Sequence, residues 1–277
     1  MENKRFFILA LTVLLLLFSC LSTSYLYANE NQKVKQWISQ LSSARERTAA
    51  KKNLIEAGDR ATPGLIYALE NESVSASVTV LIIQIFKANK SQDAIPLIKE
   101  LASSSKPRIR LESIRALGTI QGEGSVDIFK EALKDNNVRI RMSALSSLME
   151  IKDESTVPEF INSLSDPFVI VRLKALQALS LFDDASIKPA LLEQLDDINI
   201  SVAIKTVGML SDYKDKEVVE ALSEKLDTPN NKLKIKVIEA LTKIEDKSVL
   251  PRLEPMLTDE CTGVRNAAKV AVNTIGK

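Results

Sequence analysis

The stretch DPFVIVRLKALQAL, residues 166–179, shows the pattern that decides the fold. Leu173, Leu176 and Leu179 follow one another at intervals of three, which places them on one face of a helix. Each of them belongs to a column of apolar residues that recurs every 31 residues. The column of Leu179 is apolar at all eight positions: Ile55, Phe86, Leu117, Leu148, Leu179, Leu210, Leu241 and Val272. This period predicts an array of similar structural units.

The second half of each repeat has its own apolar columns, four residues apart. They hold Ile98, Phe129, Phe160, Leu191, Leu222 and Leu253, and then Ala102, Leu133, Leu164, Leu195, Leu226 and Leu257. Turn-forming residues such as Asp153, Asp215 and Asp246 separate the two halves. A proline recurs after the turn, where a first helical turn tolerates its missing amide: Pro96, Pro158, Pro189 and Pro251. Each repeat is therefore predicted to be a helix A, a short turn and a helix B.

A single hairpin of this kind cannot be stable by itself. The conformational entropy lost on ordering its residues exceeds what two short helices recover by packing against each other. Neighbouring hairpins must supply the missing burial, so we expect them to stack into a solenoid in which the B helices line one continuous surface. Residues 31–43 predict a short amphipathic cap on the first repeat.

The repeat resembles that of the HEAT-repeat family, particularly its short phycobilisome-lyase-type subtype. The family motif D-P-x-x-x-V-R is similar to residues 166–172, with variants at 135–141 and 259–265, and its A-L-G segment is similar to 116–118. The likeness extends over residues 44–277. It implies an all-α fold, a right-handed α-solenoid of about eight stacked antiparallel helix pairs.

The charged residues of this motif form a ladder along the repeats. Asp135, Asp166, Asp197 and Asp259 fall just before a helix A, where a carboxylate can cap free amides and oppose the helix dipole. A basic column lies close by: Arg110, Arg141, Arg172, Lys234 and Arg265. Each basic residue is expected to reach an acid of its own repeat or of the adjacent one. Thr48, Thr79 and Ala203 replace the basic residue in repeats one, two and six, so we expect those joints to lack the pair.

Residues 1–28 have the pattern of an export signal. Lys4 and Arg5 precede an apolar run from Phe6 to Phe18, and small and polar residues follow from Ser19. The chain is thus expected to consist of a signal peptide or membrane anchor, 1–28, and a repeat domain, 29–277. The repeat domain should be periplasmic, extracellular or held on a membrane facing away from the cytoplasm.

Three fates of this segment predict different mature proteins. Cleavage after Ala28 leaves a soluble chain that begins at Asn29. Residues 17–20 instead resemble a bacterial lipobox, in which Cys20 is lipidated and begins a mature lipoprotein. An uncleaved anchor would use residues 6–26, close to the roughly 20 needed to span hydrocarbon. The last two fates tether the chain to a membrane.

The composition narrows the chemistry. The 277 residues include no histidine, which removes the commonest general base and metal ligand. No phosphate loop, dinucleotide-binding glycine pattern, paired-cysteine metal site or nucleophile elbow occurs. We therefore predict no catalytic residue, no metal site and no cofactor. Without residues 1–28 the chain has balanced charge, and binding to nucleic acid, which needs surplus Lys and Arg, is not expected.

One column of acidic residues suggests a binding surface. Helix B carries Glu100, Glu131, Glu193 and Glu224 at a single position, interrupted by Asn162, and Asp196 and Asp227 extend it by one turn. Helix A carries the opposite sign: Arg108, Arg139, Lys174, Lys205, Lys232 and Lys236. Our hypothesis is an acidic groove that attracts a basic or amide-rich partner. The alternative is an ordinary solvated face.

These observations predict an exported, non-enzymatic scaffold that binds a protein or peptide through its stacked helices. The alternative is a lyase-like or cofactor-binding HEAT-repeat protein that acts on a small-molecule ligand. The resemblance also includes iron-dependent hydroxylases that bind metal through His-Glu pairs, and the lack of histidine excludes that activity here.

Overall fold

The computed structural model describes residues 31–120 and 124–277, and these contain helices and 3-10 turns but no β-strand. The predicted all-α fold is therefore confirmed. The export signal, Ala28 and Cys20 lie outside the described residues. Among the helices that are described, none is long and apolar enough to cross a membrane.

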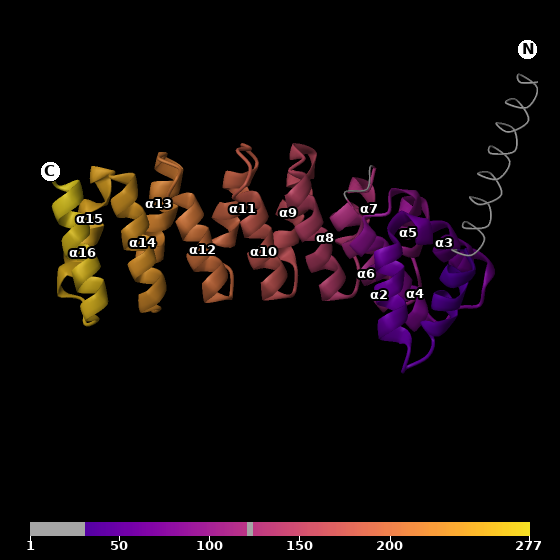
Figure 1. Cartoon of the computed structure of the whole chain (residues 1–277). Helices are drawn as coiled ribbons and strands as arrows, with labels where there is room; N and C mark the ends of the chain where they lie inside the picture. The colour runs from indigo at the N-terminus through magenta and orange to yellow at the C-terminus, as the bar shows by residue number, and fades with distance from the viewer. Residues whose placement is uncertain (1–30, 121–123) are drawn as a thin grey trace, which may run out of the picture. The chain divides into compact units, whose positions relative to one another are not determined.

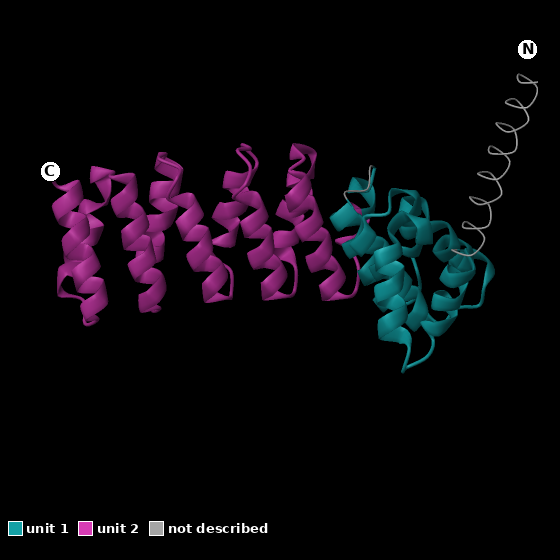
Figure 2. Ribbon diagram, viewed as in Figure 1, with its two compact units in different colours: residues 1–128 teal, residues 129–277 magenta. Residues whose placement is uncertain are grey.

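The chain divides into two compact units, the first ending at Ile128 and the second beginning at Phe129 (Figure 2). In the first unit, residues 31–40 form a helix that precedes the first pair. The pairs there, each an A helix followed by a B helix, are α2 (Arg47–Ala57) with α3 (Thr62–Asn71) and α4 (Ala76–Asn89) with α5 (Ile95–Leu101). α6 (Pro107–Ile120) is the next A helix, and its B helix, α7 (Val126–Ala132), begins in the first unit and ends in the second.

The second unit continues the same alternation (Figure 1). Its A helices and B helices come in the order α8 (Val138–Ile151), α9 (Val157–Asn162), α10 (Val169–Leu179), α11 (Ile187–Gln194), α12 (Ile200–Leu210), α13 (Lys216–Glu224), α14 (Asn231–Ile244), α15 (Leu250–Leu253) and α16 (Thr262–Ile275). The last of these is an A helix. The described residues thus form seven helical hairpins and an eighth A helix, which is an α-solenoid.

Neighbouring repeats are joined mainly through their A helices. In the second unit α12 packs against α14 and α14 against α16, and in the first unit α4 packs against α6. B helices touch one another less, as α9 and α11 do. The A helices of the second unit stand in a row in Figure 1, each beginning at its lower edge.

The predicted core columns are buried. Phe160 and Leu191 of the B helices are fully buried, and so are Leu145 and Leu176 of the A helices. The column of Leu173 is an exception, since its members in the second unit are only half-buried on the flank of their helices. The second column of the B helices is another, since Ala102, Leu133 and Leu257 are half-buried. Ile55 and Val272, the first and last members of the Leu179 column, are also half-buried, and in the first repeat Leu54 fills the core position.

In the second unit, the turn between helix A and helix B is fixed by an aspartate. Asp153, Asp184 and Asp246 each accept a hydrogen bond from the backbone amide two residues further on, at 2.7–2.9 Å. Asp215 accepts one from the amide of Val218 and so caps α13. Hydrogen bonds from these amides, with those from Ser155, Ser186 and Ser248 hydroxyls, lower the pKa of the aspartates that receive them. The turn prediction is confirmed, and its cause is local hydrogen bonding.

Phe160 tests how far stability depends on the shared core. Its ring is fully buried and lies 5.7 Å, centroid to centroid, from that of Phe182 in the next repeat. We expect Phe160→Ala to lower the free energy of unfolding by about 3–5 kcal/mol, because the cavity cannot collapse fully. Urea denaturation followed by circular dichroism measures the loss. The exposed Ile151→Ala is the control and should change it by no more than about 0.5 kcal/mol.

Candidate interaction surfaces

The six acidic residues predicted to bind a partner all lie on the surface. Glu100 is exposed on α5 of the first unit. Glu131, Glu193 and Glu224 are exposed on α7, α11 and α13 of the second unit. Asp196 and Asp227 are exposed just after the latter two B helices.

Basic side chains occupy part of this acidic column. Lys134 lies 2.9 Å from Glu131, and this contact raises the pKa of Lys134. Asp196 is paired with Lys225, and Asp227 lies 2.8 Å from Arg252. These last two pairs join successive repeats. With Glu131, half of the six predicted acids are therefore paired within the protein. The neighbouring cations offset the negative charge of these three acids.

Glu193 and Glu224 differ from the other predicted binding residues of the second unit, which are all paired. Neither makes an ion pair or a side-chain hydrogen bond within the part of the chain that the structure describes. They occupy equivalent positions on α11 and α13. Within the second unit they are the part of the predicted acidic surface that has free charge to offer to another molecule.

The B-helix surface also contains a small hollow. Its volume is about 240 Å³, and it lies between α7 and α9. Lys130 and Glu159 meet across it at 3.1 Å, and Asn162, the residue that interrupts the acidic column, lines it. The paired charges and the small volume suit a side chain of a partner better than a separate small molecule.

A second hollow, of about 270 Å³, lies in the first unit beside Trp37. Trp37 is half-buried and lines the hollow, and Lys33, Glu56 and Arg60 line it with polar side chains. The sequence predicted that residues 31–43 would cap the first repeat. The structure agrees, since Val34, Ile38 and Leu41 are buried.

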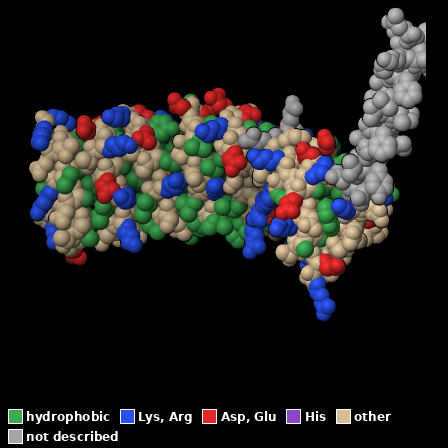
Figure 3. Space-filling model, in the orientation of Figure 1, with side chains coloured by type: hydrophobic (Ala, Val, Ile, Leu, Met, Phe, Trp, Pro, Cys, Tyr) green, Lys and Arg blue, Asp and Glu red, His purple; other side chains and the backbone are tan. Residues whose placement is uncertain are grey.

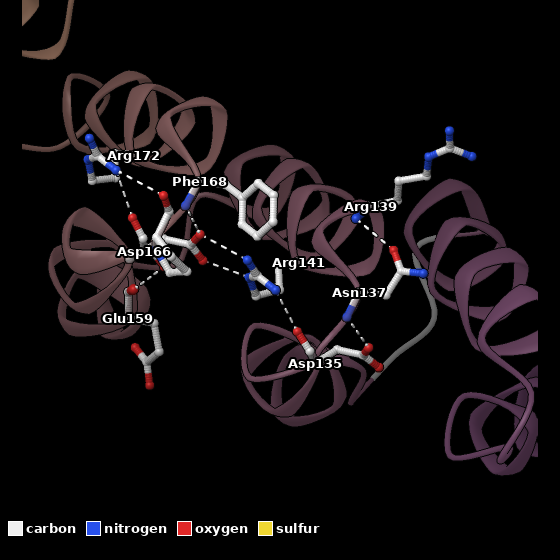
Figure 4. Close-up of polar contacts among 10 residues, drawn as sticks. Asp135, Asn137, Arg139, Arg141, Glu159, Asp166, Phe168 and Arg172 are labelled. Carbon is white, nitrogen blue, oxygen red and sulfur yellow. Dashed lines mark hydrogen bonds and ion pairs between the residues drawn. The ribbon is translucent and has the colours of Figure 1, made fainter. Parts of the chain in front are cut away.

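The ladder of charged residues is made of pairs between adjacent repeats (Figure 4). The guanidinium group of Arg141 donates to both carboxylate oxygens of Asp166, at 2.6 and 2.9 Å. Arg172 makes the same two bonds to Asp197, at 2.6 and 2.7 Å. Lys234 contacts Asp259 at 3.1 Å. In each pair the acid belongs to the next repeat, 25 residues further on.

Each ladder arginine also holds the loop before its own helix. Arg141 donates to the carbonyl oxygen of Asp135 at 2.8 Å, and Arg172 donates to that of Asp166 at 2.9 Å. The carbonyl is always six residues earlier. One buried guanidinium group thus connects two successive loops, which supports the predicted structural role.

The structure corrects the predicted role of the aspartates at the beginning of helix A. Asp135 and Asp197 do not cap the helix; each accepts a hydrogen bond from the backbone amide two residues further on. The residue two positions after the aspartate caps the helix instead. Asn137 accepts a hydrogen bond from the amide of Arg139, and Asn199 accepts one from the amide of Ser201. The aspartate lies two residues too early in the chain to cap the helix. In Asp197 the carboxylate oxygens face Arg172 of the preceding repeat instead.

Where a joint between repeats lacks the basic residue, it also lacks the aspartate 25 residues further on. Ala203 is buried in the basic column of α12, and the position 25 residues further on is Thr228. The hydroxyl of Thr228 replaces the carboxylate as acceptor for the amide of Asn230, at 3.3 Å. In the first unit, Thr79 corresponds to Ser104 in the same way. Neither joint leaves a buried charge without a partner.

Burial and hydrogen bonding act in opposite directions on Asp197. Burial raises its pKa, but hydrogen bonds from Arg172, the Asn199 amide and Gln194, together with the charge of Arg172, outweigh this effect and hold the pKa below its usual range. The same contact raises the pKa of Arg172. The pair therefore stays ionised at neutral pH.

Three exposed apolar residues were missed by the sequence analysis. Phe168 and Ile170 are at the beginning of α10, and Ile198 lies in the loop before α12. Phe168 stands in the column of helix caps, where Ser75, Asn137, Asn199 and Asn230 cap their helices, and α10 has no side-chain cap. Loss of such a cap typically costs about 0.5–2 kcal/mol. A comparison of the polar columns, made as for the apolar ones, would have detected these residues.

Residues 31–120 and 124–277 contain no group of three or more His, Cys, Asp or Glu side chains able to hold a metal ion. Cys261 is a free, half-buried thiol at the beginning of α16.

A solenoid of stacked helical hairpins, joined by arginine–aspartate pairs, defines a class of helical-repeat protein. A family model described as HEAT repeats matches residues 62–149 and 188–273, more than half of the chain. The chain belongs to the HEAT-repeat family. None of the curated proteins compared with it matches its sequence.

A solved structure with a TM-score above 0.5 shows the same fold. The Escherichia coli protein YibA has a TM-score of 0.59 and 21% identity, with 91% of this chain and 96% of that chain covered. The archaeal HEAT-like repeats protein from Thermococcus onnurineus NA1 has a TM-score of 0.47 and 17% identity, covering 82% and 97%. Human deoxyhypusine hydroxylase in complex with glycerol has a TM-score of 0.40 and 18% identity, covering 92% and 98%. At 21% identity the likeness to YibA concerns the fold alone.

The ladder predicts a specific pattern of stability. We expect Arg172→Ala to destabilise the protein by about 3–5 kcal/mol, because it leaves the Asp197 carboxylate buried without its partner. Adding Asp197→Thr, which copies the Ala203 and Thr228 joint, should restore most of the loss. Urea denaturation measures both, with the exposed Arg139→Ala as the near-neutral control. If the double variant is no more stable than the single one, the pair has another role.

The same pair predicts how stability depends on pH. A carboxylate whose pKa is lowered in the folded state stabilises the protein above the unfolded pKa, near 3.9, and this contribution is lost as the pH falls through the folded value. We expect Asp197→Asn to lower the urea midpoint at pH 7 and to approach the wild type as the pH falls from about 5 towards 2. An unchanged difference across that range would show that the carboxylate charge has no part in it.

Proposed function

We propose that this chain is an exported, non-enzymatic HEAT-repeat scaffold that binds a protein or peptide through the surface of its stacked helices. Its hairpins bury their apolar faces against one another and leave a long polar surface on the B helices. Folds of this kind typically bind through such a surface. Membership of the family and the repeated surface charges support the proposal.

The observation on which the proposal depends is the pair of free carboxylates on successive B helices. Glu193 and Glu224 are exposed at equivalent positions and have no ion pair within the described residues. Charges repeated at the spacing of the hairpins can attract a basic or amide-rich segment that runs along several repeats. Glu131 adds to this surface once its salt bridge with Lys134 is exchanged for a partner's cation.

The chemistry of the surface supports binding over catalysis. The chain has no histidine to act as a base or a metal ligand near neutral pH. The lowered carboxyl pKa values have causes that belong to the fold: hydrogen bonds in the turns between helices and in the ladder. Perturbed groups here stabilise joints and do not converge on a cleft.

Reversal of the surface charge tests the proposal. We expect the triple variant Glu131→Lys, Glu193→Lys and Glu224→Lys to lose at least tenfold in capture of its protein partners at low salt, because like charges now face each other. Affinity capture from membrane and periplasmic fractions, quantified by mass spectrometry, measures this. The control triple Glu150→Lys, Glu239→Lys and Glu260→Lys makes the same change in net charge on A helices and a loop.

Two outcomes would count against a protein-binding scaffold. One is unchanged capture by a folded triple variant, with circular dichroism as the check on folding. The other is a bound chromophore or small ligand in native mass spectra of the purified protein, which would favour the cofactor-binding alternative. The intact mass of the mature protein separates cleavage after Ala28, lipidation at Cys20 and retention of the anchor.

A further inference from the structure

Three large apolar side chains are exposed at positions where the other repeats of the second unit hold polar or small residues or proline. Phe168 is 50% exposed, Ile170 is 54% exposed and Ile198 is 99% exposed. In the other repeats of the second unit, the position of Phe168 holds Asn or Cys, that of Ile170 holds Arg, Ser, Lys or Gly, and that of Ile198 holds Asn, Pro or Glu. Figure 3 shows apolar side chains gathered at the lower edge of this unit, near the beginning of α10.

Phe168 is held in place although it does not pack in the core. Its amide donates to Asp166 at 2.8 Å, and its ring lies 5.4 Å from the guanidinium carbon of Arg141 (Figure 4). The ladder thus orients a half-exposed aromatic ring in a column where the chain elsewhere uses a helix cap. A residue that breaks a local rule with no gain in packing marks a functional position. An oriented ring also loses little freedom on binding.

The surroundings of these apolar residues are basic. Neither α10 nor α12 contains an acidic residue. Lys174 and Lys205 on these helices, and the side chain of Arg139 at the beginning of α8, have no ion pair within the described residues. The nearby acids are already used: Asp166 and Asp197 in the ladder, and Asp196 with Lys225.

We propose that this basic apolar edge, formed by Phe168, Ile170 and Ile198 with Arg139, Lys174 and Lys205, docks an acidic segment of another protein that also carries apolar side chains. Charge complementarity selects the acidic partner. Phe168 and Ile170 are about half exposed and Ile198 is almost fully exposed, so apolar side chains of the partner can pack against them. This binding is additional to that of the B-helix surface and involves the opposite charge.

The test uses the full chain and a labelled twelve-residue peptide that repeats Asp-Phe-Glu-Leu, with binding followed by fluorescence anisotropy. We expect Phe168→Asn with Ile198→Asn to weaken binding at least tenfold while the thermal midpoint stays the same or rises, because asparagine can cap α10 as it caps α8. The control Val270→Asn, which removes an equally exposed apolar residue from α16, should bind as the wild type does. Lys174→Glu with Lys205→Glu should also abolish binding.

The outcomes that would overturn the proposal are distinct. Equal binding of a peptide that repeats Lys-Phe-Lys-Leu would show that charge plays no part. A fall in the thermal midpoint of the asparagine variant would show that Phe168 serves packing. Preferential binding to phosphatidylglycerol vesicles, lost in the same variant, would assign the edge to a membrane. The B-helix charge reversal should leave peptide binding unchanged, so each of the two proposals can fail without the other.

Discussion

The rest of the structure depends on one constraint: a helical hairpin of this length cannot bury its own apolar face. Leu145, Leu176 and Phe160 reach full burial because the next repeat covers them, and each repeat in turn exposes a new face to its successor. Cohesion is greatest between A helices, which contact one another along the row. B helices contact each other less, so their outer side chains remain available to other molecules.

Apolar stacking alone does not orient one hairpin against the next, because leucine, valine and isoleucine contacts have little directionality. The Arg141–Asp166 and Arg172–Asp197 pairs supply that directionality through two parallel hydrogen bonds in fixed geometry. A buried ion pair adds little net stability, yet losing one partner is costly. This accounts for the joint at Ala203, where the arginine and the carboxylate are both absent.

The two proposed surfaces exist because contacts elsewhere in the molecule hold the repeats together. On the B helices, Glu193 and Glu224 keep free charge because the hairpins are held together elsewhere. At the beginning of α10, the Arg141–Asp166 pair that joins two repeats also contacts Phe168 and so orients its exposed aromatic ring. Surfaces of opposite charge on one solenoid allow two different segments to bind at once.

The sequence by itself determined the all-α fold, the 31-residue period and most of the core, because side chains repeated at helical spacing have to meet one another when hairpins stack. It also indicated the ladder residues, but not which atoms they bond. Only the tertiary structure decided that Arg172 reaches Asp197 of the next repeat, that Asn199 and not Asp197 caps its helix, and that half of the acidic column is already paired. The physical reason is that periodicity assigns a residue to a face of its helix, whereas the pairing of charges depends on the rotation and offset of the neighbouring hairpin. The column of helix caps marks Phe168 as unusual in the sequence, whereas the exposure of its ring and its contact with Arg141 depend on the tertiary structure.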